Sequence, residues 1–492
     1  MKQQESPAAI PKIPPLRRGF LRYIGSVFAD VLALVLIHLL FRQQFIPAPM
    51  VFYSIIGGVS HATQVPGLDW FIVLATAMIA ILHISGFYRQ RLPFWEEARA
   101  LVKACLIAAF CDFAVLLLSG HPVNTMLLLS GWMLTIGALF ISRYSVRRIL
   151  WAWGYWQMPV VIIGDGHNLL ETARALNSEQ QLGYNISLAI CIDAEGAAIA
   201  PQLGIPYHLI ESDKVLDLIE QLGPLHAIIA LEQAQLPKFR PLLMNLGQYP
   251  HILEIIPPLT GVPLYGTDLI YLFGQEVLLL RTRNNLDRRL PRVVKRVFDL
   301  VAASLLVLVL SPLFVYLAWR IRKESGSPVF YVQQRIGRHG QFFPCIKFRS
   351  MVHNAEEVLT RWSRDNPELY RQYHETKKLR DDPRITPIGK VIRTYSLDEL
   401  PQLFNVLRGE MSLVGPRPIL EREQSEYGVG IANYHRVSPG LTGLWQISGR
   451  AETSFQDRAN YDDWYIKNWS IWFDLVILVR TITVVFNRNG AY

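Results

Sequence analysis

The sequence has few charged residues and few cysteines for its length. Charged residues make up 18% of the 492 residues and hydrophobic residues 51%. The chain is therefore too apolar for an ordinary soluble enzyme and too charged for a bundle of membrane helices alone. Its four cysteines form no CxxC pair and no metal-ligand spacing, so we expect buried thiols in a reducing compartment. No P-loop, HExxH or GxSxG motif is present, and we expect no removable signal peptide at the N-terminus.

Long apolar runs predict a membrane α-helical bundle in residues 1–150. Basic residues precede the first run, separate the second from the third and follow the fourth, which places both the N-terminus and everything after residue 143 on the cytoplasmic side. The net charge of +9 therefore indicates an anionic membrane surface as partner rather than nucleic acid. A stretch at 45–60, broken by prolines and glycines, is expected to be an external loop. The predicted spans cover about 20–41, 69–87, 100–119 and 123–142.

Residues 151–285 alternate short β-rich runs with helical ones, which predicts an α/β Rossmann-like domain with a parallel sheet. Its first turn, from Gly164 to Leu169, resembles a dinucleotide fingerprint but has leucine where the third glycine belongs. Asp193 could bind a ribose, although it stands farther on than usual. Two interpretations stay open here: a dinucleotide site, and a regulatory or scaffolding domain that binds no dinucleotide.

The apolar stretch 299–320 opens the third predicted domain, residues 286–492. Basic residues flank it on both sides, so both ends favour the cytoplasmic face, which a single span cannot satisfy. Ser311 and Pro312 stand in its middle, where proline predicts a kink and serine can bond a freed carbonyl. We expect a re-entrant helix that enters one leaflet and returns; the alternative is a proline-kinked true span.

An adjacent carboxylate pair, Asp398 and Glu399, stands among arginines, lysines and glycines. One explanation is a structural capping box from Ser396 to Glu399. Pro401 fits better as the first residue of the following helix, which leaves the acidic pair in the turn at its N-terminus. Such a position favours phosphate nearby and suits phosphoryl transfer. Candidate phosphate-binding residues around the pair are Lys347, Arg349, Arg384, Arg393 and Arg417.

The ordered motifs of residues 290–492 resemble the monotopic phosphoglycosyl transferases, also called bacterial sugar transferases. The segments that carry the resemblance are "RVFDL...SP", "KFRSM", "DPRITPIGKVIR", "LDELPQLFNVLRGEMSLVGPRP" and "PGLTGLWQISGR". With the added membrane bundle and Rossmann-like domain, the chain resembles the large members of this family. The resemblance also implies that Ser311 and Pro312 form the break of the family's re-entrant membrane helix.

The resemblance implies a two-step reaction that needs Mg²⁺. Asp398 matches the nucleophile that attacks the β-phosphorus of a UDP-hexose, with release of UMP. Undecaprenyl phosphate then takes the hexose-1-phosphate from the aspartate, and the resemblance favours galactose over glucose as the hexose. Asp398 and Glu399 would form the metal site, and Lys347, Arg393 and Arg417 match basic positions of the family. The family further implies the bacterial inner membrane, with the catalytic domain on its cytoplasmic side.

A last apolar run at 468–486 contains Asp474 and Arg480, which would be costly in mid-bilayer. We expect an interfacial helix or a core helix of the catalytic domain. The apolar surface of the N-terminal part also makes a homodimer an expectation. Two other functions stay open: a membrane-bound nucleotide-sugar sensor or adaptor without catalysis, and an NAD-dependent nucleotide-sugar enzyme, which the incomplete glycine fingerprint disfavours.

Overall fold

The computed structural model describes residues 17–41, 70–118, 125–210, 214–215, 226–232, 235, 252–259, 262–263, 265–271, 278–282, 285–365, 371, 382–448 and 454–486. The chain forms two compact units, Met1–Leu259 and Thr260–Tyr492. The first unit combines the helices expected in 1–150 with most of the sheet expected in 151–285, and the second contains the candidate active site. The predicted external loop at 45–60 lies outside the described residues.

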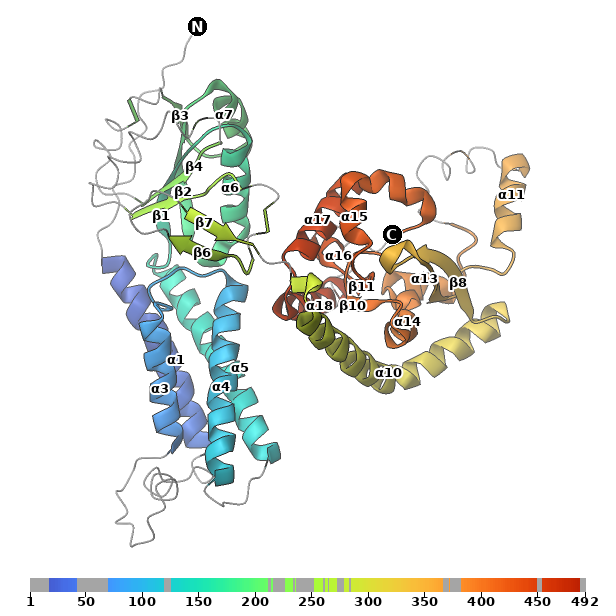
Figure 1. Cartoon of the computed structure of the whole chain (residues 1–492), viewed down its shortest axis with the longest axis horizontal. Coiled ribbons are helices and arrows are strands. Elements are labelled where there is room, and N and C mark those ends of the chain that lie inside the picture. The colour runs from blue at the N-terminus through green and yellow to red at the C-terminus, as the bar shows by residue number, and fades with distance from the viewer. Residues whose placement is uncertain are drawn as a thin grey trace. The chain divides into compact units, whose positions relative to one another are not determined.

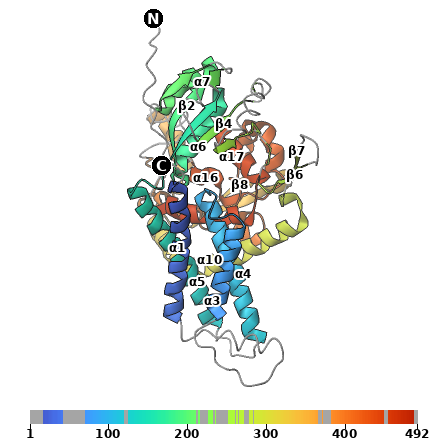
Figure 2. The ribbon, with the colours of Figure 1, turned by 90° about the vertical axis from the view of Figure 1, so that its left-hand side faces the viewer.

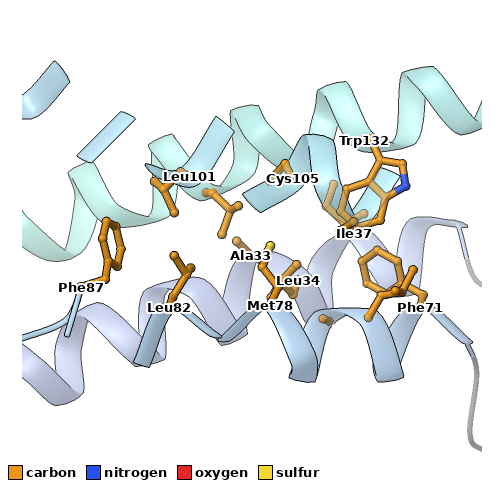
Figure 3. Close-up of a cluster of buried hydrophobic side chains, with 14 of the residues drawn as sticks. Ala33, Leu34, Ile37, Phe71, Met78, Leu82, Phe87, Leu101, Cys105 and Trp132 are labelled. Carbon is orange, nitrogen blue, oxygen red and sulfur yellow. The ribbon is translucent and has the colours of Figure 1, made fainter. Parts of the chain in front are cut away.

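Four helices of the first unit lie side by side as a bundle (Figures 1 and 2). Leu34, Phe71 and Trp132 pack in its core (Figure 3), whereas Leu40 and Phe110 on its outside are 75% and 71% exposed. An apolar outer surface of this kind is suited to lipid contact. The predicted apolar helices are thus confirmed, although the second is shorter than expected. They are α1 (Arg17–Phe41), α3 (Trp70–Ile84), α4 (Phe94–Leu118) and α5 (Thr125–Ala152), and all but α3 are long and apolar enough to cross a membrane.

A five-stranded sheet with strand order β3-β2-β1-β4-β5 completes the first unit, and every neighbouring pair is parallel. The central strands β1 and β4 read as continuous apolar runs because both faces of the sheet are covered there. This confirms the predicted α/β sheet. The elements are β1 (Met158–Gly164), α6 (Gly166–Ser178), η2 (Gln180–Leu182), β2 (Tyr184–Cys191), α7 (Ala194–Ile199), η3 (Ala200–Leu203), β3 (Tyr207–Leu209), β4 (His226–Ala230) and β5 (Ile252–Ile255).

The N-terminus of α6, where a dinucleotide would place its pyrophosphate, is occupied by a carboxylate of the chain itself. Oε1 of Glu232 accepts a hydrogen bond of 3.0 Å from the backbone N–H of His167. The same oxygen lies 2.4 Å from where a Cβ on Gly166 would stand, so glycine makes room for the carboxylate. Asp193 caps α7 by accepting from the N–H of Gly196 at 2.8 Å. These contacts favour the scaffolding interpretation over a dinucleotide site.

The second unit has a long bent helix, several short strands and a group of helices. Its first part contains β6 (Asp268–Tyr271), β7 (Leu278–Arg281), η5 (Asn285–Asp287), α10 (Arg289–Ser325), β8 (Phe330–Ile336), η6 (Arg338–Gly340), β9 (Phe342–Phe348) and α11 (Ala355–Asp365). The remainder contains α13 (Pro387–Thr394), η7 (Leu397–Glu399), α14 (Gln402–Arg408), β10 (Ser412–Val414), η8 (Glu421–Gly430), α15 (Ile431–Tyr434), β11 (Gly440–Thr442), α16 (Leu444–Ser448), α17 (Phe455–Lys467) and α18 (Ile471–Phe486).

Helix α10 is 37 residues long and bends in its middle, between its olive and yellow halves (Figure 1). Pro312 has no N–H to donate to the carbonyl of Leu308, which would otherwise be its helical partner. The hydroxyl of Ser311 donates to that same carbonyl at 2.8 Å. Serine therefore satisfies the acceptor that proline leaves, as the sequence predicts.

Both halves of α10 are held by the second unit. In the first half, Lys295 donates to Asp474 at 2.7 Å, and Arg296 donates to the carbonyls of Val406 and Leu407 at 2.6 and 2.9 Å. In the second half, Glu324 accepts from the N–H of Ile388 at 3.1 Å. Between these anchors the helix exposes large apolar side chains: Leu305 (59%), Leu308 (71%), Val309 (64%) and Val315 (70%).

Candidate active site

The hairpin of β8 and β9 supplies the first side chain of the candidate site. Alternation along β9 places Phe343, Cys345 and Lys347 on one face of the strand, and the first two are buried. Lys347 ends this row, where Nζ lies 2.7 Å from Oε1 of Glu399. The strand thus brings a half-buried ammonium to the carboxylate pair that the sequence singles out.

Asp398 and Glu399 lie in the 3₁₀ turn η7, directly before α14. Ser396 precedes the turn with φ of 55°, a left-handed conformation that is uncommon for a residue with a side chain. Its side chain makes no capping hydrogen bond, so the capping box considered from the sequence does not form. Pro401 stands at the N-cap of α14, one residue before the position expected for it. The carboxylates therefore lie in a tight turn between α13 and α14.

The surroundings of Asp398 perturb its protonation. Burial and the negative charge of Glu399 raise the pKa of Asp398 to about 6, against the opposing effect of Lys347 and Arg393. Lys347 is hydrogen-bonded to Glu399. Near neutral pH the Asp398 carboxylate is ionised and more basic than an ordinary aspartate, which suits a nucleophile.

Asn405 fixes the position of α14 against the hairpin. It is fully buried, accepts from the N–H of Ile346 at 3.1 Å and donates to the carbonyl of Pro344 at 2.8 Å and to Glu410 at 2.5 Å. Because α14 follows η7 directly, these bonds hold Glu399 and Lys347 at a fixed separation.

A pocket with an empty volume of about 250 Å³ lies beside Lys347 and Glu399. Arg335 and Arg417 also line it, so three cations face one carboxylate. Burial and the positive charge of Arg417 lower the pKa of Arg335. The guanidinium of Arg417 lies 5.5 Å from the ring centroid of Trp445. An electropositive pocket with arginine forks is chemically suited to phosphate groups.

The carboxylate pair is the best candidate for holding a divalent cation. The described residues contain no group of three or more His, Cys, Asp or Glu side chains arranged around one point. Mg²⁺, however, is commonly held by one or two carboxylates and completes its octahedron with substrate phosphates and water. The donors of Asp398 and Glu399 fit a cation of this kind, whereas they would not form a closed structural metal site.

Comparison with known proteins identifies the family. Residues 290–488 match the family described as "Bacterial sugar transferase". The chain is 39% identical to the "UDP-galactose-lipid carrier transferase" of Erwinia amylovora, over 87% of this chain and 91% of the relative. It is 38% identical to the "Undecaprenyl-phosphate galactose phosphotransferase" of Salmonella typhimurium, over 82% and 84%. The chain belongs to the bacterial sugar transferase family. The resemblance drawn from its motifs is thereby confirmed.

A further relative shows that similarity over the whole chain is not restricted to proteins named for galactose. The "UDP-glucose:undecaprenyl-phosphate glucose-1-phosphate transferase" of Xanthomonas campestris is 33% identical over 90% of this chain and 91% of its own length. The similarity to these relatives therefore extends well beyond residues 290–488 of this sugar transferase, into the unit that carries the membrane bundle and the sheet.

The structure brings together three of the five predicted phosphate-binding residues. Lys347 and Arg417 line the pocket, and Arg393 acts electrostatically on Asp398 while its Nε donates to the hydroxyl of Ser350 at 2.8 Å. The other two, Arg349 and Arg384, contact backbone and side-chain groups of the second unit away from Asp398 and the pocket.

Arg349 lies at the C-terminal end of α10, where it donates to the carbonyls of Ser325 and Gly326 at 2.8 and 2.6 Å. Arg384 forms a forked pair with Asp382, with Nη2 to Oδ2 at 2.6 Å and Nε to Oδ1 at 2.9 Å. Although burial acts to raise it, the pKa of Asp382 is lowered by these hydrogen bonds from Arg384. Both arginines therefore help to fix helix ends and turns around the site.

Three pocket residues with charged or amide side chains were not singled out from the sequence: Arg335, Gln402 and Gln446. Arg335 lies on β8 and donates to the carbonyl of Pro418, next to Arg417, at 3.1 Å. The strand has several polar residues, so the sequence pattern offers no signal that separates Arg335 from its neighbours. Only the register of the hairpin turns it toward Lys347.

The last helix, α18, packs into the core of the second unit along one side, as expected for a core helix, while its placement at a membrane interface stays a prediction. Asp474 is fully buried, where it binds Lys295 at 2.7 Å and accepts from the hydroxyl of Tyr465 at 2.7 Å. The outer side of the helix exposes Val479 (51%) and Ile482 (59%). The charge that looked costly for a bilayer is therefore neutralised inside the protein.

Proposed function

We propose that this chain transfers a hexose-1-phosphate, galactose-1-phosphate being favoured, from a UDP-hexose to undecaprenyl phosphate. The observation that carries the proposal is the environment of Asp398: a carboxylate with a raised pKa beside the Lys347–Glu399 pair and an electropositive pocket. The names of the relatives in Erwinia amylovora and Salmonella typhimurium support the lipid carrier and the sugar. The product would start the assembly of O-antigen or exopolysaccharide repeat units.

The reaction has two displacements at one phosphorus atom. A carboxylate oxygen of Asp398 attacks the β-phosphorus of the UDP-hexose, the bond to the bridging oxygen breaks, and UMP leaves with the electron pair. An oxygen of undecaprenyl phosphate then attacks the hexosyl-phosphoryl aspartate. The aspartyl C–O–P linkage breaks at phosphorus, which releases undecaprenyl-diphosphate-hexose and restores the Asp398 carboxylate.

The residues of the pocket and of the neighbouring η7 turn and α13 have separate tasks in this scheme. Lys347, Arg335 and Arg417 bind the diphosphate oxygens, and Arg393 acts on the charge at Asp398. Glu399 is held by Lys347, and together with Asp398 it would hold Mg²⁺, which offsets charge on the phosphates when it is bound.

UMP release tests this assignment directly. Full-length protein in detergent is supplied with UDP-galactose, Mg²⁺ and undecaprenyl phosphate, and UMP is measured. The Asp398→Asn variant should lose the release, while Asp463→Asn, which changes a surface carboxylate paired with Lys467, should keep it. UDP-sugar binding without UMP release by the wild-type protein would support the sensor or adaptor instead. Release that survives Asp398→Asn would remove the nucleophile.

We further infer that α10 is a re-entrant membrane helix with both ends on the cytoplasmic face. A helix of 37 residues is about 55 Å long, much more than the roughly 30 Å of a hydrocarbon core. Its two halves are tied to the same polar unit through Lys295 and Glu324, while the side chains around the bend are apolar and exposed. A straight crossing would separate these anchors by the thickness of the membrane.

A cysteine at residue 324 tests the topology. In Glu324→Cys, a membrane-impermeant thiol reagent should label inverted inner-membrane vesicles and fail to label intact spheroplasts, with wild-type protein as the background control. Labelling from the periplasmic side would mean a true span. The same vesicles also test the proposed inner-membrane location with cytoplasmic sheet and catalytic domains.

The sheet of the first unit supports a Rossmann-like scaffold as its role. Its parallel strand order, β3-β2-β1-β4-β5, is that of doubly wound sheets, and Glu232 occupies the end of α6 where such folds place a pyrophosphate. The homodimer remains part of the proposal, and the mass of the detergent-solubilised protein tests it.

A further inference from the structure

A second pocket lies within the first unit, at the end of the bundle where α1 and α4 begin and α3 and α5 end. Its empty volume is about 370 Å³. The walls come from α1, α4 and α5, from the segment between α3 and α4, and from two segments that flank the sheet, so the pocket joins the bundle to the sheet domain. We refer to it as the junction pocket. Its lining contains Arg22, Ser26, Phe87, Tyr88, Gln90, Arg91, Leu92, Glu97, Arg143, Arg147, Trp156 and Gln181.

Two of the four arginines that line the junction pocket are matched by carboxylates. Arg143 binds Asp30 through Nε and Nη2 at 2.6 and 2.5 Å and Glu97 through Nη1 at 2.5 Å. Arg147 binds the other oxygen of Glu97 and also donates to the side-chain oxygen of Gln181 at 2.5 Å. Asp30 and Glu97 are the carboxylate partners in these contacts, so their two negative charges neutralise the positive charges of Arg143 and Arg147.

The other two arginines have no carboxylate partner among the described residues. Arg22 donates to the carbonyls of Arg89 and Gln90 at 2.7 and 3.2 Å. Arg91 donates to the carbonyls of Trp156 and Leu182 at 3.2 and 2.5 Å. Burial and the nearby charge of Arg22 lower the pKa of Arg91 to about 10, which still leaves it protonated at neutral pH. The junction pocket therefore holds about two positive charges in excess.

Nearby groups offset only part of this excess. Glu254, on β5, does not line the pocket but acts electrostatically on Arg91 from the sheet. It also accepts from the hydroxyl of Tyr184 at 2.8 Å and lies 3.1 Å from His226. The Nε atoms of Arg22 and Arg147 are buried and have no hydrogen-bond partner in the part of the chain that the structure describes. Arg22 and Arg91 are half-buried, and a half-buried cation without a carboxylate partner is costly, so an anion in the pocket would lower that cost.

Local structure holds this arrangement in place. Trp156 forms one wall, with the guanidinium of Arg147 at 4.9 Å and that of Arg91 at 5.9 Å from its ring centroid. Gly183, with φ of 70°, leaves the space that Trp156 occupies, because a Cβ there would lie 2.6 Å from the ring. Packing against Gly183 thus holds Trp156 in place as one wall of the pocket.

We propose that the junction pocket binds a phosphate group through Arg22 and Arg91. Arginine pairs two N–H donors with phosphate oxygens, and a basic pocket at the end of membrane helices is a recognised setting for lipid headgroups. The phosphate can come from an anionic lipid headgroup or from a free phosphate compound. The site is separate from the catalytic pocket, which shares no lining residue with it.

Binding to delipidated full-length protein in detergent tests the proposal and separates the two sources. One arm titrates inorganic phosphate, a second phosphatidylglycerol, and a third phosphatidylcholine as the lipid of no net charge; native mass spectrometry counts bound molecules and thermal unfolding reports affinity. One bound phosphate or phosphatidylglycerol per chain is expected, with phosphatidylcholine much weaker. Saturation by inorganic phosphate identifies a free compound, and saturation by phosphatidylglycerol alone identifies a headgroup.

Variants assign the binding to the pocket. Arg22→Gln and Arg91→Gln should each lower the affinity for the bound probe at least about tenfold, whereas Arg148→Gln should leave this affinity unchanged. Arg148 is an exposed neighbour of Arg147 that does not line the pocket, so it controls for general surface charge. Absence of binding of both phosphate and phosphatidylglycerol to the wild-type protein would overturn the proposal, whatever the variants do. Equal affinities in Arg91→Gln and Arg148→Gln would overturn it as well.

Discussion

Replacement of Lys347 by Met is expected to shift the pH profile of UMP release. In the proposed reaction Asp398 must be ionised to attack phosphorus, and its pKa is raised to about 6 by burial and by Glu399. In the wild-type protein, kcat/KM should therefore fall about tenfold per pH unit below about 6 and level off above it. Lys347 favours the ionised form of Asp398, so removing Lys347 raises the pKa of Asp398 and moves the acid limb of the profile to higher pH.

The size of the shift follows from the charge that is removed. Lys347 acts electrostatically on Asp398. At an effective dielectric constant of about 20, even a unit charge as far away as about 10 Å contributes about 1.7 kcal/mol, which is slightly more than one pH unit. Lys347 also neutralises Glu399 across 2.7 Å. Without the ammonium, the full charge of Glu399 acts on Asp398 in the same direction. We therefore expect the acid limb of Lys347→Met to lie at least about one pH unit above that of the wild type.

The assay is UMP release from UDP-galactose between about pH 5 and 9, with kcat/KM fitted at each pH. Lys347→Met should also lower the plateau, because the pocket loses a phosphate-binding cation, but the plateau and the limb are separate readouts. Lys390→Met, on the exposed side of α13, is the matched control and should leave the limb unmoved. A wild-type limb near pH 4, or a limb that stays in place in Lys347→Met, would refute the reasoning.

Three further outcomes follow from the second unit. Burial raises the pKa of Asp462 to about 7, so the folded state retains a proton that the unfolded state loses. The free energy of unfolding should therefore fall as pH rises from about 4 to 7, and thermal unfolding should show a smaller fall for Asp462→Asn. Asn405→Ala should lower the free energy of unfolding by about 1–3 kcal/mol, because it leaves main-chain groups of β9 without their hydrogen-bond partner. Asn433→Ala should lower it less, and thermal unfolding measures both. Pro312→Ala supplies an N–H to the Leu308 carbonyl and should straighten α10. Transfer to undecaprenyl phosphate should then be reduced more than UMP release. Unchanged transfer would show that the bend is dispensable.

The features that could be predicted from the sequence are those set by local pattern. Long apolar runs located α1, α4 and α5, and β-rich runs spaced by helical ones located the parallel sheet, because periodicity and composition are local properties. Pro312 similarly predicted the bend of α10, and Ser311 predicted the hydroxyl that donates to the carbonyl left free at the bend. The carboxylate pair stood out because Pro401 fixes where α14 can begin.

What could not be predicted depends on contacts between distant parts of the chain. Arg384 and Arg393 look alike in the sequence, yet the first is paired with Asp382 and the second faces Asp398. Asp474 looked out of place in an apolar run because its partner, Lys295, is far away along the chain. Arg335 reaches the pocket only through the register of β8 against β9. Each of these assignments needs the tertiary arrangement.

The anchors of α10 couple its curvature to the catalytic geometry. Arg296 donates to carbonyls in the last turn of α14, and Glu324 accepts from the N–H of Ile388 in the first turn of α13. The two halves of the bent α10 therefore hold the helices on either side of Asp398. With α10 re-entrant, as proposed above, a lipid layer that flattens or sharpens the bend would pull these helices apart or press them together. Bilayer thickness would then change the geometry around Asp398 through the bend at Pro312.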